Sequence, residues 1–181
     1  ERVAIVDIDA HHGNGTQDAF YRDGRVLFVS CHQWPLYPGT GALDETGDGD
    51  GLGTTVNLPL PEGAAGDTYR YALDRVIVPV VERFGPDWLL VSAGFDAHCD
   101  DPLGELRLTP EGFARMTRCV KEAAAQSCGG RMVSLPAETR WSREGGGKLA
   151  VGLQFIDPGE KIAQDVRAYP EYMGTPVEDE E

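Results

Sequence analysis

Residues 4–15 read AIVDIDAHHGNG, and this stretch decides the fold. Its first half is an apolar run of the kind that forms a parallel strand covered on both faces. The run leads into Asp7, Asp9, His11 and His12, which fall within six positions. Side chains two residues apart share one face of a strand, so Asp7 and Asp9 point the same way and His11 continues that direction. The stretch therefore predicts a buried strand that carries acids and imidazoles to one edge of a sheet.

The segments that follow alternate between strand-like and helix-like patterns. Strands are expected at 3–8, 25–30, 54–57, 88–92 and 131–135. A short helix is expected between the first two strands. A second is expected from an Asp67 N-cap to Phe84, with a kink at Pro79 and with apolar positions at helical spacing at Ala72, Val76, Val80 and Phe84. A third is expected from Thr109-Pro110 to Gly129-Gly130 with Phe113, Met116 and Val120 facing inward. This alternation predicts an α/β fold with a mainly parallel sheet flanked by helices.

The pattern changes after about residue 135. Residues 136–181 have no clean periodicity, and their acidic end is typical of a solvated tail. We therefore expect two parts, a folded α/β part at 1–135 and a divergent C-terminal segment at 136–181. The chain opens on Glu1 and enters a strand almost at once, so we expect it to start partway through a domain.

Composition narrows the class of protein. The 181 residues carry a net charge of −14, which argues against binding to DNA or to anionic lipid because both need clustered Lys and Arg. No apolar run approaches the ~20 residues of a membrane span, and cationic ligands suit the charge better. The cysteines lack the C-x-x-C spacing of metal sites and are expected to be reduced, mostly buried thiols, which predicts a cytoplasmic protein. They are Cys31, Cys99, Cys119 and Cys128.

A second strand end repeats the pattern of the first. Residues 89–104, LLVSAGFDAHCDDPLG, bring Asp96 out beyond an apolar strand, with His98 close behind. Ligands of open α/β sheets bind at the carboxyl ends of strands, where both ends would meet. Asp9, His11 and Asp96 would then supply oxygen, nitrogen and oxygen, a set of three ligands that leaves a position open for water, as catalytic zinc requires.

Simpler interpretations remain for some of these residues. Asp96 alone is typical of a turn or a helix cap, although two buried acids in one strand need a cation nearby. Residues 44–51, DETGDGDG, resemble a calcium loop but lack its closing Glu and its flanking helices, so a tight glycine loop is expected there.

Three long motifs carry a family resemblance. They are DIDAHHGNGTQDAFYRDGRVLFVSCHQ at 7–33, YPGTGALDETGDGDGLGTTVNLPLP at 37–61 and LLVSAGFDAHCDDPLG at 89–104. In this order they resemble the histone deacetylase and acetylpolyamine amidohydrolase family, closest to its class II and bacterial members, over residues 2–135. The resemblance implies the arginase/deacetylase α/β fold, here incomplete. It also implies a zinc-dependent deacylase that releases acetate from an acetyl-lysine peptide or an acetylpolyamine.

The resemblance also implies roles for single residues. Zinc would be bound by Asp9, His11 and Asp96. Asp7 would orient one of the family's two catalytic histidines, and Asn14 stands where a residue partners the other. A structural potassium ion would be enclosed, largely through backbone carbonyls, by Asp7, Asp9, His11, Ser30 and Cys31. Tyr37 would form an aromatic wall of the acyl-lysine tunnel.

Departures from the family pattern leave other functions open. The family's histidine pair lies upstream of the strand that opens this chain, and its Glu-Gly-Gly-Tyr motif has no tyrosine in register here, since the Glu-Gly-Gly at 144–146 is followed by Gly147. We therefore expect little activity from this chain alone, so a non-catalytic metal-binding fragment is one alternative. A binuclear manganese ureohydrolase using Asp96, His98 and Asp100 is another, although Gly13 stands where it would need an acid. The oligomeric state stays open.

Overall fold

The computed structural model describes residues 1–127, 137–145 and 148–155. The chain divides into two compact units at residue 132, and each is described by itself. The strand expected at 131–135 and the acidic tail lie outside the described residues. Among the described helices, none is long and apolar enough to cross a membrane.

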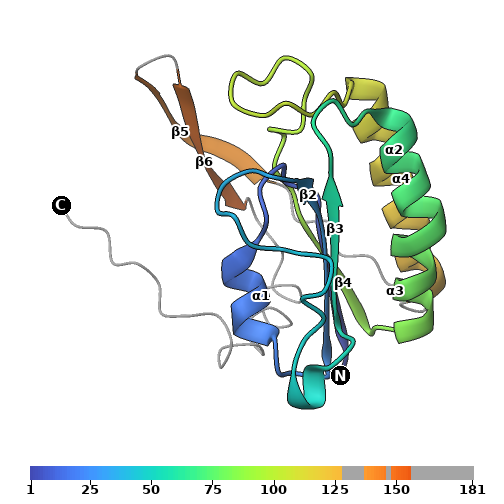
Figure 1. The fold of residues 1–181 in the computed structure, drawn as a ribbon. Coiled ribbons are helices and arrows are strands. Elements are labelled where there is room, and N and C mark those ends of the chain that lie inside the picture. The colour runs from blue at the N-terminus through green and yellow to red at the C-terminus, as the bar shows by residue number, and fades with distance from the viewer. Residues whose placement is uncertain (128–136, 146–147, 156–181) are drawn as a thin grey trace. The chain divides into compact units, whose positions relative to one another are not determined.

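The first unit contains a four-stranded parallel sheet (Figure 1). Its strands are β1 (Val3–Asp7), β2 (Val26–Gln33), β3 (Thr55–Leu60) and β4 (Trp88–Ser92), in the order β3-β2-β1-β4. Each lies where the sequence predicts a strand, and β2 and β3 run three residues further than expected. All eight residues of β2 are buried, as expected for a central parallel strand.

Helices cover both faces of this sheet, as the alternating pattern predicts (Figure 1). One face carries α1 (Asn14–Phe20). The other carries α2 (Gly66–Ala72), a π-helical turn (Leu73–Ile77), α3 (Val78–Phe84) and α4 (Pro110–Ser127). Phe113, Met116 and Val120 are buried on α4, which confirms the inward face expected from their spacing.

The segment from 66 to 84 departs from the single kinked helix expected. The helix cap is Ala65, not Asp67, and Asp67 lies in the first turn, where it pairs with Arg70 at 3.2 Å. The π-helical turn comes directly before α3, in which Pro79 is the second residue.

The same π-helical turn shifts the buried face of this segment. Its extra residue moves the later apolar positions by one, so Ile77 and Val81 are buried where a regular helix would bury Val76 and Val80. Periodicity alone assumes a constant 3.6 residues per turn, and the prediction was wrong here for that reason.

One edge of the sheet exposes apolar side chains. Within the described residues β4 pairs with β1 alone, in register from Val3 opposite Trp88 to Asp7 opposite Ser92. Leu90 is 51% exposed and Val91 is 45% exposed. Unlike β2, β4 is therefore not covered on both faces.

The second unit contains two strands that the sequence analysis did not expect. β5 (Ala137–Gly145) and β6 (Lys148–Phe155) pair antiparallel, with an irregularity between Thr139 and Trp141. That irregularity breaks the alternation of period two by which a strand is recognised. The glycine run at 145–147 is a turn signal that could have indicated the pairing.

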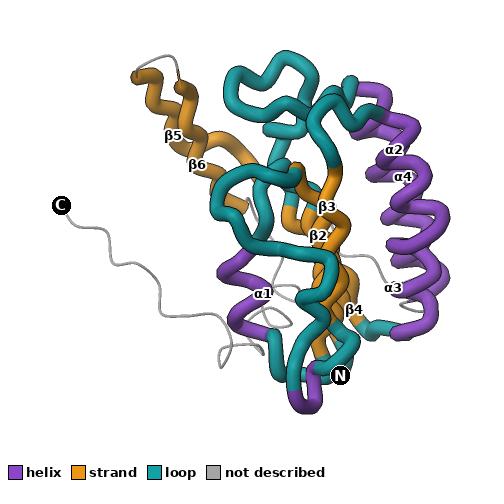
Figure 2. Tube along the Cα trace, viewed as in Figure 1, coloured by secondary structure: helices purple, strands orange, loops and turns teal. Residues whose placement is uncertain are grey.

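The loops that leave β2 and β4, residues 34–48 and 93–109, begin beyond the carboxyl ends of these strands (Figure 2). The first of them then runs back along the sheet, where Asp48 N donates to Tyr21 O at 2.9 Å. The residues that follow β1 lie between them, because Ile8 N donates to Ser92 O at 2.9 Å and Gln33 N donates to Ala10 O at 2.9 Å. The fold therefore places the acids and histidines singled out in the sequence at one end of the sheet.

Candidate metal centre

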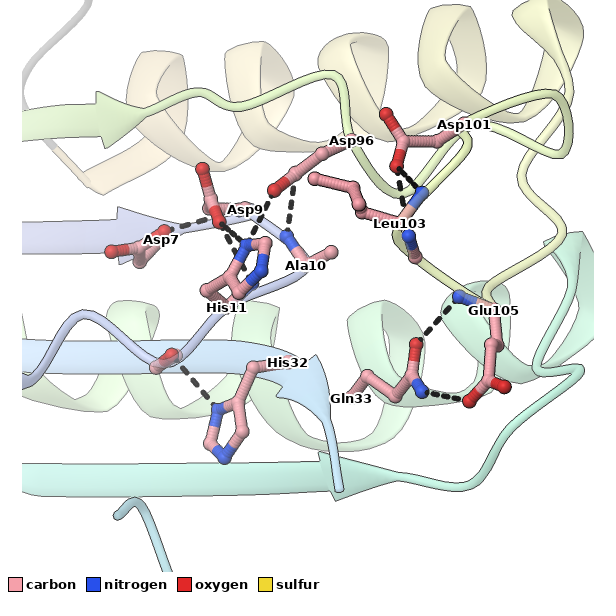
Figure 3. A network of polar contacts seen from close by, with 12 residues as sticks. Asp7, Asp9, Ala10, His11, His32, Gln33, Asp96, Asp101, Leu103 and Glu105 are labelled. Carbon is pink, nitrogen blue, oxygen red and sulfur yellow. Dashed lines mark hydrogen bonds and ion pairs between the residues drawn. The ribbon is translucent and has the colours of Figure 1, made fainter. Parts of the chain in front are cut away.

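Three donor atoms converge at this end of the sheet (Figure 3). His11 Nδ1 lies 2.6 Å from Asp96 Oδ2 and 3.2 Å from Asp9 Oδ1. The ligand atoms of the three residues all lie within 4.8 Å of one another. The sequence predicted this meeting of two strand ends 85 residues apart.

Backbone amides hold the two carboxylates in place. His11 N donates to Asp9 Oδ1 at 2.7 Å, and Ala10 N donates to Asp96 Oδ1 at 2.8 Å. Each carboxylate thus has one oxygen fixed by the turn after β1, and the Asp96 carboxylate turns its other oxygen toward His11. Burial, with Asp96 close by, raises the pKa of Asp9. Two adjacent carboxylates and an imidazole nitrogen form a donor set that fits Zn²⁺.

Gly94 gives these carboxylates their space. A Cβ at position 94 would collide with Asp9 Oδ2 and lie 2.9 Å from Asp96 Oδ1. Only glycine therefore lets the chain after β4 pass so close to the ligand carboxylates. The sequence analysis missed this residue, although a glycine two positions before a strand-end acid is a signal of close backbone approach.

Asp7 lies beneath the three donors and is 3% exposed. Asp9 N donates to Asp7 Oδ1 at 3.1 Å, and burial raises the pKa of Asp7 to about 6. Within residues 1–127 no lysine or arginine forms an ion pair with it. A buried carboxylate with no such partner fits a nearby cation.

Residues named for the potassium site lie beside Asp7. Ser30 is opposite Asp7 in the ladder of β1 and β2, and both Ser30 and Cys31 are fully buried. Burial raises the pKa of the Cys31 thiol to about 12, so its neutral side chain leaves the backbone carbonyl as the group suited to a hard cation. The arrangement is compatible with potassium bound among backbone oxygens.

The other two predicted site residues lie at the surface. Tyr37 is 80% exposed on the loop after β2, and Asn14 is exposed at the start of α1. The structure brings neither into contact with the three donor atoms.

The loop that carries Tyr37 is anchored to the turn after β1 that carries His11. His12 Nδ1 and Thr40 Oγ1 lie 2.8 Å apart. Gly41 has φ +93°, and a Cβ there would lie 2.6 Å from both His12 and His32, so this position requires glycine.

A buried polar network completes this anchor, and sequence reasoning did not find it. Gln17 Oε1 lies 3.0 Å from His12 Nε2 and accepts from Asn57 Nδ2 at 2.7 Å. Gln17 Nε2 donates to Glu45, whose other oxygen accepts from the backbone amide of Gly41 at 3.1 Å. Both ring nitrogens of His12 thus have structural partners. The network spans α1, β3 and the loop after β2, and no local sequence pattern links such distant positions.

His32 is fully buried beside this network. Its Nδ1 accepts from Ser30 Oγ at 3.0 Å and its Nε2 donates to Gly41 O at 3.0 Å, which is the pattern of a neutral imidazole. Burial, together with neighbouring His12, lowers the pKa of His32 from 6.5 to about 4. Between these values the unfolded chain binds a proton that the folded chain does not.

Neutral His32 is therefore expected to stabilise the fold above pH 6.5, and this contribution should be lost as the pH falls toward 4. We expect the free energy of unfolding, measured with urea at several pH values, to fall between pH 7 and pH 4 by about 3 kcal/mol less in His32→Gln than in the parent. The raised pKa of Asp7 makes the fold more stable as the pH falls, which is the opposite effect. Both proteins contain Asp7, so the difference between their stability curves reports His32. Parallel stability curves would contradict this expectation.

A second clamp joins β2 to the loop after β4 (Figure 3). Gln33 Nε2 donates to Glu105 Oε2 at 2.8 Å, and Glu105 N donates to Gln33 Oε1 at 2.8 Å. In the same loop Asp101 Oδ1 accepts from the amides of Leu103 and Gly104 at 2.9 and 2.8 Å. These contacts fix the loop that carries Asp96.

The structure argues against a binuclear centre built on Asp96, His98 and Asp100. Asp96 turns toward His11, whereas His98 groups with Cys99 and Asp100 in a separate cluster. Gly13 stands where a further acid would be needed, and a Cβ there would collide with Asp7 Oδ2. A side chain at position 13 has no room.

Comparison with protein families decides the relationship. The histone deacetylase domain model matches residues 1–137. The chain belongs to the histone deacetylase family. The resemblance found in the three motifs is thereby confirmed, and the solved structures of family members confirm the α/β fold.

Individual members of the family share between a third and half of their aligned residues with the chain. A probable deacetylase of Archaeoglobus fulgidus is 50% identical over 145 residues, which are 80% of this chain and 40% of the relative. The solved structure of the histone deacetylase Clr3 superposes with a TM-score of 0.66 at 45% identity, over 72% of this chain and 22% of that one. The solved structure of an acetylpolyamine aminohydrolase from Burkholderia pseudomallei superposes with a TM-score of 0.64 at 37% identity, over 70% of this chain and 43% of that one. The chain thus spans less than half the length of these family members.

Proposed function

We propose that this chain supplies the zinc-binding part of a deacylase that hydrolyses the amide of an acetyl-lysine peptide or an acetylpolyamine. The observation that carries the proposal is the convergence of Asp9, His11 and Asp96 on one point at the carboxyl ends of β1 and β4. Zinc held there would polarise the amide carbonyl and acidify a bound water. Family membership supports zinc as the metal.

The chain's own residues would hold and orient the reacting groups. Amides of the turn after β1 fix the Asp9 and Asp96 carboxylates. We assign Asp7 and Asn14 to orienting a histidine pair that another segment supplies. Tyr37 is assigned to the wall of the acyl-lysine tunnel, on the loop that His12 anchors.

A potassium ion is proposed beneath the zinc site, enclosed by backbone carbonyls near Asp7. The buried, unpaired Asp7 carboxylate supports this site. Its other proposed members are Asp9, His11, Ser30 and Cys31.

Net charge supports the proposed substrate class. At −14 the chain favours a cationic acetylated amine over nucleic acid or an anionic membrane surface. A cytoplasmic location and a boundary near residue 135 stay predictions.

A second candidate is a metal-binding fragment without turnover of its own, and the histidines favour it. All four histidines of the chain have other partners. His11 faces the two carboxylates, His12 and His32 are hydrogen-bonded in the buried network, and His98 lies in the separate cluster. None is left beside the centre as a general base.

A chimera tests the first proposal. The region of the Archaeoglobus fulgidus relative that corresponds to residues 1–127 would be replaced by these residues of the chain, so that the relative supplies the segments on both sides, including its own counterpart of the Glu-Gly-Gly-Tyr region. We expect release of acetate from an acetyl-lysine peptide or acetylspermidine, inhibited by chelators. Asp96→Asn in the chimera should remove it, whereas Asp67→Asn, far from the centre, should not. An inactive but folded chimera that still binds zinc would contradict the proposal.

A further inference from the structure

We propose that His98, Cys99 and Asp100 form a second metal site, for a thiophilic divalent ion such as Zn²⁺ or Cd²⁺, independent of the Asp9–His11–Asp96 centre. His98 Nδ1 lies 4.0 Å from Cys99 Sγ and 3.9 Å from Asp100 Oδ2. The three donor atoms all lie within 4.8 Å of one another. The proposed function leaves all three side chains without a role.

The backbone brings three consecutive side chains to one side. Asp101 N donates to His98 O at 3.0 Å, which closes a turn over these residues. Cys99 N donates to Leu108 O at 2.9 Å, and Leu108 N donates to Ala97 O at 3.0 Å. Because Leu108 is fully buried, these two hydrogen bonds tie the residues on either side of His98 to the core. The donors therefore converge on a fixed scaffold, which lowers the ordering cost of binding a metal.

The imidazole is already oriented for coordination. The His98 ring stacks on Phe113, with an interplanar angle of 13° and 6.3 Å between ring centroids. Its Nδ1 accepts from Asp100 N at 3.1 Å, so that nitrogen carries a lone pair and no proton. An ion would displace this weak amide contact and find the lone pair free on the side facing Cys99 and Asp100.

Donor chemistry defines the class of ion. A thiolate, an imidazole and a carboxylate suit Zn²⁺ or Cd²⁺, whereas Mg²⁺ and Ca²⁺ prefer oxygen alone. Tetrahedral zinc with bonds of roughly 2.0–2.3 Å separates its ligand atoms by about 3.5 Å, close to the spacing of this cluster. The metal itself favours the thiolate, since a coordinating thiol loses its proton. A water would complete the coordination because Asp101 is held by two loop amides.

Cys99 gives the site a signature that the first centre lacks. Ligands of the first centre are two carboxylates and an imidazole, so only the second site forms a metal–thiolate bond. Titrating the 181-residue chain with CdCl₂ should therefore produce an ultraviolet cadmium–thiolate charge-transfer band, and in the Asp96→Ala variant, where the first centre is removed, this band should saturate at one ion per chain. Cys99→Ser should abolish the band. His98→Gln should weaken the binding by at least about 100-fold, since even loss of an outer partner of a metal ligand costs roughly 10- to 100-fold.

Matched variants separate this site from the first one and from the other thiols. Asp96→Ala and His11→Ala remove ligands of the first centre only, so the band should persist in both. Cys119→Ser and Cys128→Ser should also keep it, and Cys31 is fully buried. Circular dichroism checks that each variant is folded. No band in the folded parent, or a band that survives Cys99→Ser, would overturn the proposal, while loss of zinc binding at the first centre alone would leave it intact.

Discussion

His11→Ala and Asp96→Ala are each expected to abolish zinc binding at the centre formed by β1 and β4. Each removes one of three donors and leaves the others as a pair of carboxylates or an acid and an imidazole, which bind Zn²⁺ far more weakly in water. The measurement is isothermal titration calorimetry in the Cys99→Ser background, where only this centre remains. The parent in that background should bind one ion per chain.

Asp67→Ala is the matched control for this experiment, because it removes an exposed carboxylate that pairs with Arg70 at the surface. It should bind zinc as the parent does. Unchanged zinc affinity in both ligand variants would exclude the assignment of these donors. Thermal unfolding without metal separates lost coordination from lost folding, since all variants should melt cooperatively.

The isolated 181-residue chain is expected to turn over acetyl-lysine or acetylpolyamine substrates several orders of magnitude more slowly than the chimera. General base catalysis contributes about 10²–10⁴ in rate, and one oxyanion donor contributes about 10²–10³. The chain holds proposed zinc ligands, but its histidines are all otherwise engaged, and no tyrosine follows its Glu-Gly-Gly. Even if the two losses in rate are not additive, the chain should remain far slower than the chimera.

Acetate release by equal concentrations of chain and chimera, each loaded with zinc, measures this difference. Chelator-sensitive turnover by the chain at the rate of the chimera would contradict the expectation. In that case His12 or His98 would have to act as the base, and His12→Gln and His98→Gln would identify which. For His12 this would require breaking its contact to Thr40 or to Gln17.

The sequence predicted the parts of this structure that depend on local pattern. Apolar runs located β1, β2 and β4, and strand-end acids located Asp9 and Asp96, because strands of a parallel sheet end on the same side. Gly94 and the network through Gln17 were not foreseen. Their roles depend on which segments approach each other in space, and that information is spread over positions far apart in the chain.

Errors in the sequence analysis had equally local causes. The π-helical turn at Leu73–Ile77 inserts one residue into a regular period, and the irregularity after Thr139 interrupts an alternation. Both are departures from an ideal repeat, which a periodicity argument cannot see. The binuclear alternative for Asp96, His98 and Asp100 rested on a spacing alone, D-x-H-x-D, and the structure groups Asp96 with His11 but His98 with Cys99 and Asp100.

Within the described residues the outer edge of β4 has no strand partner, and this has a consequence for the chain in solution. An edge strand of this kind, beside half-exposed Leu90 and Val91, is a template onto which another strand can add. At low ionic strength the charge of −14 keeps molecules apart, and salt screens this repulsion within about 10 Å at 0.1 M. Attraction through the edge of β4 and repulsion between negatively charged molecules therefore oppose each other. We expect the chain to stay dispersed in dilute buffer and to associate more readily as salt is added.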